Sequence, residues 1–203
     1  MTDVKFNKIL ISLNALIPLA LLGYDAVRGQ LGANPVEFFL RTTGVLTLLF
    51  IMITLAVTPL RKILNWNEAI KYRRMLGLYA FFYGCIHLST YAVFDRELSL
   101  SGTVADVIQR PFIAIGMAAF LAMVPLAITS TNAMIKRLGG KRWQRLHRLV
   151  YLVGILGVIH FWMIVKSDIF YPAIFGLVVL ALLGYRVAKS KKLNMPKPAP
   201  RSA

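Results

Sequence analysis

Six apolar stretches, each about as long as a membrane-spanning helix, constrain the fold of this 203-residue chain. A helix needs about 20 residues to cross the hydrocarbon core of a bilayer. Short polar segments separate the stretches, and no strand pattern is visible. Residues 130–142 are expected to form a loop, and residues 95–110 an exposed loop because they contain acidic residues, Ser and Gly. We therefore predict an all-α fold, a bundle of six transmembrane helices over residues 8–27, 38–60, 75–94, 111–129, 141–163 and 168–187.

The composition supports a membrane protein over a nucleic-acid-binding protein. Hydrophobic residues make up 58% of the chain, whereas soluble domains have roughly 45–50%. The net charge of +16 would suit nucleic acid, but the basic residues lie between the apolar stretches and not along one basic face. We therefore expect contact with membrane lipid and none with nucleic acid. The single cysteine, Cys85, excludes an internal disulfide and a cysteine-based metal cluster.

The basic residues also predict the orientation in the membrane. With six spans, both termini share one side, and most of the 24 Lys and Arg fall on that side. The exceptions are Arg28, Arg41, Arg96, Arg110 and Lys166. Because cytoplasmic loops carry the excess of Lys and Arg, both termini are predicted to be cytoplasmic. We expect one transmembrane domain over residues 1–187 and a basic, Pro-containing, disordered cytoplasmic tail over residues 188–203.

All three histidines, His87, His147 and His160, fall inside apolar stretches. An ionisable side chain in a membrane-spanning segment is costly, so it usually lines a cavity or binds something. Neutral imidazole is a frequent protein ligand of haem iron. The alternative for any one of them is a core histidine that only makes hydrogen bonds.

Counting from the basic residues at the cytoplasmic interface gives the depth of each histidine. His87 lies about a dozen residues beyond Arg74, and His160 lies as far beyond Arg148, which at about 1.5 Å per residue is roughly 18–20 Å. Both helices run outward, so the two imidazoles are level and are predicted to be axial ligands of one outer haem. His147 lies near the cytoplasmic surface, where an inner redox centre is predicted.

The pairing of His147 is left open by the sequence. The level position on the helix over 75–94 is Arg73 or Arg74, not a histidine. At about 100° per residue, an ideal helix would not point His147 and His160 in the same direction. Either that helix is distorted, near Gly154 and Gly157, or the two side chains face different neighbours.

Arginines at the same end are the remaining candidate cofactor-binding residues. Arginine makes bidentate bonds to carboxylates and phosphates, so these side chains could pair with haem propionates or a flavin phosphate. The alternative for each is ordinary anchoring on the cytoplasmic side. The candidates are Arg73, Arg74, Arg145 and Arg148, of which Arg74 and Arg148 join the three histidines in the predicted site.

A small transporter or proton channel with proton-relaying histidines is the competing interpretation. It would place acidic partners within the helices and show an internal repeat. Almost all Asp and Glu lie outside the predicted helices, and no repeat is visible. The pattern therefore favours a haem protein that carries electrons.

Several segments are similar to a known family. RRMLGLYAFFYGCIHLSTYA, RPFIAIGMAAFLAMVPLAITSTNAM, RWQRLHRLVYLVGILGVIHFWMIVK and LGANPVEFFLRTTG resemble the MsrQ family, within the ferric-reductase-like transmembrane group. The resemblance covers about Asn7 to Arg186. Relatives in the wider group use two histidine pairs on two helices to stack two b haems across the membrane.

The resemblance implies a multi-pass protein of the bacterial inner membrane that binds haem b, with one or two haems, and FMN. It implies electron transfer from a cytoplasmic flavin reductase or from quinol to a periplasmic molybdopterin reductase, MsrP, which repairs methionine sulfoxide in envelope proteins. The chain would be an electron-transfer subunit with no complete catalytic site of its own. The family histidines carry over as His87, His147 and His160. The helix over 75–94 lacks a cytoplasmic-side histidine to pair with His147, which departs from the four-histidine relatives.

Overall fold

The computed structural model of the protein describes residues 3–165 and 167–193. Within those residues, six helices are long and apolar enough to cross a membrane, and no strand is present. The prediction of an all-α bundle with six spans is confirmed. The spans are α1 (Asp3–Val27), α2 (Pro35–Ile63), α3 (Arg73–Thr90) continued by the π-helical turn η2 (Tyr91–Asp95), α5 (Pro111–Ile128), α7 (Gly140–Leu146) with α8 (Leu149–Ile164), and α9 (Phe170–Leu193).

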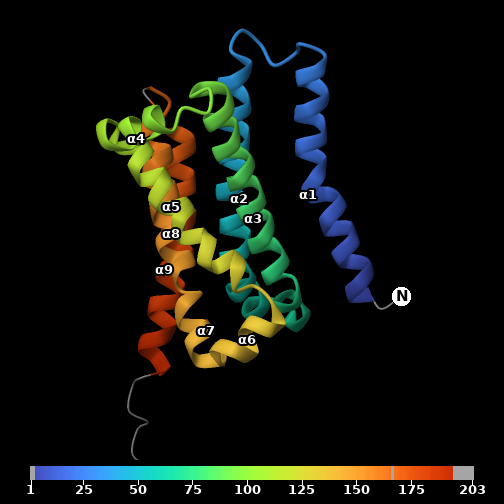
Figure 1. Cartoon of the computed structure of the whole chain (residues 1–203). Coiled ribbons are helices and arrows are strands. Elements are labelled where there is room, and N and C mark those ends of the chain that lie inside the picture. The colour runs from blue at the N-terminus through green and yellow to red at the C-terminus, as the bar shows by residue number, and fades with distance from the viewer. Residues whose placement is uncertain (1–2, 166, 194–203) are drawn as a thin grey trace, which may run out of the picture.

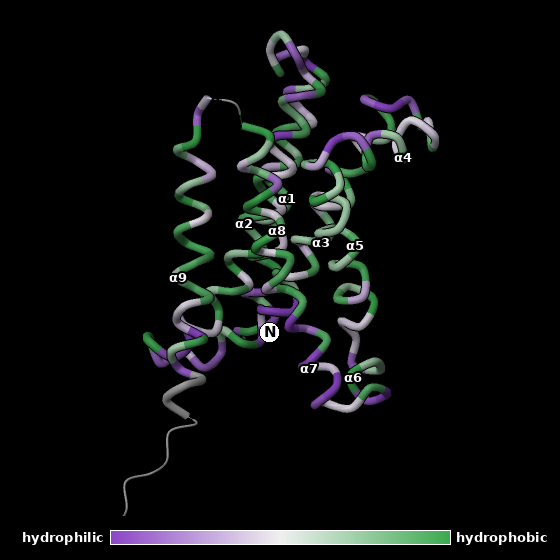
Figure 2. The backbone as a smooth tube through the Cα atoms, turned by 90° about the vertical axis from the view of Figure 1, so that its left-hand side faces the viewer, coloured by the Kyte–Doolittle hydropathy of each residue, from purple (hydrophilic) through white to green (hydrophobic). Residues whose placement is uncertain are grey.

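The spans stand side by side, with α1 at the edge of the bundle (Figure 1). The start of α1, the end of the described part of α9, and both α6 (Asn132–Leu138) and α7 lie at the same end, while α4 (Leu100–Gln109) lies at the other (Figure 1). Hydrophobic residues dominate the length of the spans, and hydrophilic residues gather at the ends (Figure 2). We refer to the end that carries α6 and α7 as the inner end.

Helix boundaries follow recognisable local signals. Pro35 and Pro111 occupy the first turns of α2 and α5, where the missing N–H costs no hydrogen bond. The Asn34 side chain accepts a hydrogen bond from the Glu37 N–H and caps α2.

At the other end of the chain, α9 continues to Leu193. Residues 188–193, which the sequence assigned to a disordered tail, are therefore helical, and residues 194–203 lie outside the described residues.

Two segments expected to be loops contain helices. Residues 95–110 were expected to form an exposed loop because they are acidic and rich in Ser and Gly, but they hold α4, whose first turn is capped by the Ser99 hydroxyl. Asp106 on α4 is only 5% exposed. It accepts hydrogen bonds or ion pairs from Tyr91, Arg96 and Arg110. Asp106 is thus buried against Tyr91 and two arginines, and the prediction of an exposed loop, which treated its charge as a sign of exposure to water, was wrong. The expected loop over 130–142 likewise contains α6.

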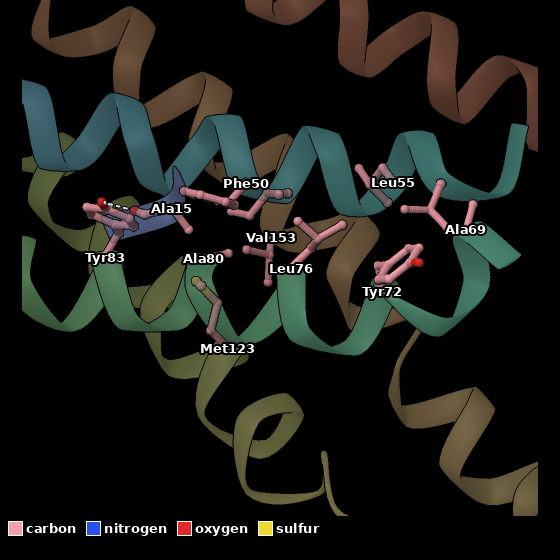
Figure 3. Packing of buried hydrophobic residues seen from close by; sticks show 12 residues of the cluster. Ala15, Phe50, Leu55, Ala69, Tyr72, Leu76, Ala80, Tyr83, Met123 and Val153 are labelled. Atoms are coloured by element: carbon pink, nitrogen blue, oxygen red, sulfur yellow. Dashed lines mark hydrogen bonds between the residues drawn. The ribbon is translucent and has the colours of Figure 1, made fainter. Parts of the chain in front are cut away.

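The best-packed part of the bundle lies along the α2–α3 hairpin (Figure 3). Tyr83 is fully buried there and its ring stacks on Phe50, with 5.5 Å between ring centroids. The Tyr83 hydroxyl donates a hydrogen bond to the Ala15 carbonyl oxygen of α1 at 2.5 Å, drawn in Figure 3. A weaker link joins Asn7 to the Tyr72 hydroxyl at 3.2 Å. Since few α1 residues are buried, these bonds hold the edge helix to the bundle.

Replacing Tyr83 by phenylalanine should loosen α1 selectively. The ring and its packing remain, while one buried hydrogen bond worth about 1 kcal/mol is lost. In detergent, we expect faster amide hydrogen exchange in α1 of Tyr83→Phe, with little change in α2 and α3. Tyr171→Phe, which removes the hydroxyl of an exposed tyrosine, is the matched control. Equal exchange of α1 in both variants would show that this bond does not hold the helix.

Candidate functional site

His87 on α3 and His160 on α8 face each other inside the bundle. Their ring centroids are 6.3 Å apart, with the ring planes at 86°. Both side chains are half-buried. The structure therefore brings together the two imidazoles that the sequence placed at one depth.

A backbone carbonyl of the neighbouring helix orients each ring. His87 Nδ1 lies 3.0 Å from the Leu40 carbonyl oxygen of α2, and His160 Nδ1 lies 2.6 Å from the Phe112 carbonyl oxygen of α5. A carbonyl oxygen can only accept, so each Nδ1 carries the proton. Each Nε2 is therefore unprotonated in the neutral ring and can bind a metal ion, as in many metal-binding histidines.

A glycine four residues after each accepting carbonyl gives the ring its space. A Cβ atom at Gly44 would lie 3.2 Å from His87 Cε1, and one at Gly116 would lie 2.7 Å from His160 Cε1. In a helix the N–H of residue i+4 bonds the carbonyl of residue i, so the side chain at i+4 stands beside that carbonyl. Glycine at both positions therefore leaves the carbonyl open to an imidazole, most strictly at Gly116.

The same arrangement thus occurs twice, once between α2 and α3 and once between α5 and α8. In both, a carbonyl in the first third of one helix and the glycine one turn later receive a histidine from the partner helix. Sequence reasoning missed these four supporting residues and considered other glycines instead. The available signal was a glycine four residues after an apolar residue, shortly after a helix-starting proline, in both helices.

His147 is held differently. It lies at the junction of α7 and α8, and its ring stacks on Trp143 with 3.9 Å between centroids. Its Nε2 lies 3.0 Å from the Thr129 hydroxyl oxygen. That hydroxyl donates to the Pro125 carbonyl oxygen at 2.6 Å, so it accepts from Nε2–H. His147 therefore presents Nδ1 as its unprotonated nitrogen, the opposite of the other two histidines.

The geometry resolves both alternatives for the helix that carries His147 and His160. The helix is interrupted at His147 and Arg148, between α7 and α8, and not near Gly154 and Gly157, which lie inside α8. The two histidines also face different neighbours, Thr129 and Trp143 in one case and Phe112 and Gly116 in the other.

A cavity of about 480 Å³ lies beside His147 at the inner end. Such a volume is in the range of small-molecule and cofactor sites. Its polar lining includes His147 together with Arg73, Arg74 and Arg148, and aromatic walls come from Phe81 and Tyr151. Both predicted arginines, Arg74 and Arg148, thus lie on this cavity, whereas Arg145 is outside its lining. Arg74 Nη1 donates to the Asn132 amide oxygen at 2.6 Å.

The donor set fits a haem better than a bare metal ion. Among the described residues, no group of three or more His, Cys, Asp or Glu comes close enough together to hold a metal, whereas zinc takes at least three protein ligands. Two facing imidazoles supply only two ligands, which is what an iron already held by a porphyrin takes from the protein. His87 and His160 are therefore the residues that would hold such an iron, through their unprotonated Nε2 atoms.

Adding a methyl group at Gly116 should displace the His160 ring from its present position. The new Cβ would stand 2.7 Å from the ring, so the imidazole must leave its hydrogen bond to Phe112. We expect Gly116→Ala to weaken haem retention by about 10- to 100-fold, the usual effect of disturbing a residue that orients a metal ligand. Haem content after purification is the measurement.

Gly184→Ala is the control, because a Cβ there meets nothing within 4 Å. Equal haem content in Gly116→Ala and Gly184→Ala would contradict the role assigned to the glycine.

Comparison with known proteins places the chain in a family. Residues 39–158 match the family model described as "Ferric reductase like transmembrane component". A protein of Herminiimonas arsenicoxydans is 50% identical over 182 residues, covering 89% of this chain and 84% of the relative. A protein of Ralstonia nicotianae is 49% identical, covering 91% and 86%. One of Rhodospirillum rubrum is 42% identical, covering 97% and 94%.

All three relatives carry the name "Protein-methionine-sulfoxide reductase heme-binding subunit MsrQ". The similarity to these relatives extends over 89–97% of the chain. At this identity and coverage, the chain belongs to the MsrQ family of haem-binding subunits, within the ferric-reductase-like transmembrane proteins.

Proposed function

We propose that the chain is a haem b electron carrier of the bacterial inner membrane, in which His87 and His160 ligate one haem through their Nε2 atoms. The observation that carries the proposal is the facing pair of imidazoles, 6.3 Å apart and each fixed in the same tautomer by a carbonyl. The bound haem iron would supply one-electron redox chemistry. Family membership supports the haem, because the relatives' names describe a haem-binding subunit.

In this proposal, the protein contributes ligand orientation and insulation. The carbonyls of Leu40 and Phe112 hold the two imidazole rings in place. The rings would therefore move little when a group bound between them gains or loses an electron. Each hydrogen bond from Nδ1 also makes the free Nε2 a better ligand. The apolar helices around the pair keep water away, which influences the redox potential of a bound group.

The inner cavity would hold the second redox cofactor, through which electrons enter. His147, Arg74 and Arg148 line it. A second haem or an FMN would suit the cavity, since arginines bind propionates and flavin phosphate alike. Ligation of a haem by His147 would use Nδ1, or would require Nε2 to leave the Thr129 hydroxyl. FMN stays a prediction from the resemblance.

The direction of electron flow follows from the proposed orientation. The inner end, with its basic residues, would face the cytoplasm, where a flavin reductase or quinol would supply electrons. The end that carries α4 would face the periplasm and a molybdopterin reductase of the MsrP type, which would use the electrons to repair oxidised methionine in envelope proteins. The relatives' names, which call them subunits of a protein-methionine-sulfoxide reductase, support a catalytic partner.

Spectra of histidine variants test the ligand assignment. We expect the protein, purified in mild detergent, to be red and to show a b-type reduced-minus-oxidised spectrum. His87→Ala and His160→Ala should lose the outer haem, because a single imidazole leaves one axial position without a protein ligand. His147→Ala should retain it, because His147 contacts Thr129 and Trp143, not the His87–His160 pair.

Pyridine-haem and flavin quantitation gives the cofactor count in each variant. Loss of the outer haem in His87→Ala and His147→Ala, but not in His160→Ala, would show that the wrong pair was chosen. A colourless wild-type protein would overturn the haem proposal and favour the transporter interpretation.

A further inference from the structure

Within the described residues, no arginine at the inner end is seen in an ion pair with a carboxylate. The chain has eight Asp and Glu residues, and all lie within the described residues: Asp3, Asp25, Glu37, Glu68, Asp95, Glu97, Asp106 and Asp168. Their ion pairs use Arg41, Lys71, Arg96 and Arg110. Among the described residues, neither Arg73, which lines the inner cavity, nor Arg186, which packs on the cavity residue Tyr151, therefore has an anionic partner.

Arg186 is the more unusual of the two, because α9 places it inside the bundle. Its Nη2 donates to the Leu55 carbonyl oxygen of α2 at 2.8 Å. Its guanidinium carbon lies 4.7 Å from the centre of the Tyr151 ring. Both Nε and Nη1 are shielded from solvent and have no hydrogen-bond acceptor among the described residues. Buried polar groups in proteins almost always have hydrogen-bond partners, so two donors without an acceptor on one guanidinium are unusual and need an explanation.

The unmatched donors belong to the neighbourhood of the inner cavity. Tyr151, on which Arg186 packs, forms part of the cavity wall, and so does Arg73. The like charges of Arg73, which lines the cavity, and Arg186, which packs against its Tyr151 wall, repel each other. Two cations that have no anionic partner among the described residues are costly beside one cavity in a membrane-spanning bundle, and an anion bound there would relieve the repulsion and supply hydrogen-bond acceptors.

We propose that Arg186 and Arg73 form the anion-binding pair of the inner cavity and hold the carboxylate or phosphate of the cofactor bound there. The planar guanidinium matches either group through paired N–H donors. A haem propionate and a flavin phosphate share this chemistry. The inference rests on the proposed function, because it requires a cofactor in the cavity, and it adds a residue of α9 to the site.

Substitution of each arginine in the full-length purified protein tests the pair. Arg186→Gln and Arg73→Gln should lower the midpoint potential of the redox component that His147→Ala perturbs, because a nearby positive charge favours the reduced state. Both should also reduce the amount of that cofactor several-fold. Arg186→Lys keeps the positive charge but loses the paired N–H donors of the guanidinium, so its effect on the midpoint potential and on the cofactor content should be smaller. Lys189→Gln, on the same helix, is the matched control and should change neither quantity.

Pyridine-haem, flavin and lipid-phosphorus quantitation identifies the source of the anion. Loss of haem or flavin from both glutamine variants supports the proposal and says which group is held. Loss of bound phospholipid with unchanged cofactor content and potential would show that the pair binds a lipid headgroup, which overturns it. Because Arg73 lines a cavity and is not fully buried, Arg73→Gln remains informative if Arg186→Gln fails to fold.

The outcomes separate this inference from the proposed function. An inner cofactor that both glutamine variants leave unchanged in amount and potential would refute the arginine pair while the electron-transfer proposal stands. A wild-type protein that carries the outer haem but no inner cofactor would refute both the arginine pair and the proposed second redox cofactor of the inner cavity.

Discussion

The structure of the site depends on hydrogen bonds between imidazoles and helix carbonyls. A carbonyl inside a helix already accepts one bond from the N–H four residues on, and it has a second lone pair to offer. In this protein, the Leu40 and Phe112 carbonyls offer that lone pair to His87 and His160. In a membrane interior, where water does not compete, such a bond both satisfies the ring N–H and fixes which nitrogen is left to bind a metal.

This requirement explains the two glycines and the pairing of the helices. A side chain at Gly116 would force the His160 ring to move, and one at Gly44 would crowd the His87 ring. Each histidine is therefore bound to a hairpin partner, α2 for His87 and α5 for His160, and the two hairpins meet where the rings face each other. The two hairpins are thus similar units that each present one oriented imidazole to the same space.

The inner end follows a different physical logic. The chain places almost all of its carboxylates away from the inner cavity and surrounds that cavity with arginines, one histidine and aromatic walls. His147 already uses Nε2 in a bond to Thr129. Under the proposed function, the oriented imidazoles of His87 and His160 would ligate a metal, and the positively charged inner cavity would recognise an anionic group.

The sequence predicted features that are set within a single helix, and it failed where contacts between separate segments decide the structure. The apolar stretches determined the six spans because their length must match the bilayer, and counts along helices of fixed rise determined that His87 and His160 lie at one depth. Polar content misled at residues 95–110, because a charge that is paired in the fold looks in the sequence like one exposed to water. Asp106 shows this, since Tyr91, Arg96 and Arg110 surround it.

The sequence by itself therefore determined the class of fold, the number of spans and the residues that could ligate a cofactor. Only the tertiary structure decided which nitrogen each histidine presents and where the helix of His147 and His160 is interrupted. It also decided that Arg186 of α9 lies beside Tyr151 with two donors that have no acceptor among the described residues. Those features arise from contacts between helices distant in the chain. Periodicity and composition describe each helix alone, so they carry no information about the carbonyl, glycine or ring that another helix brings to it.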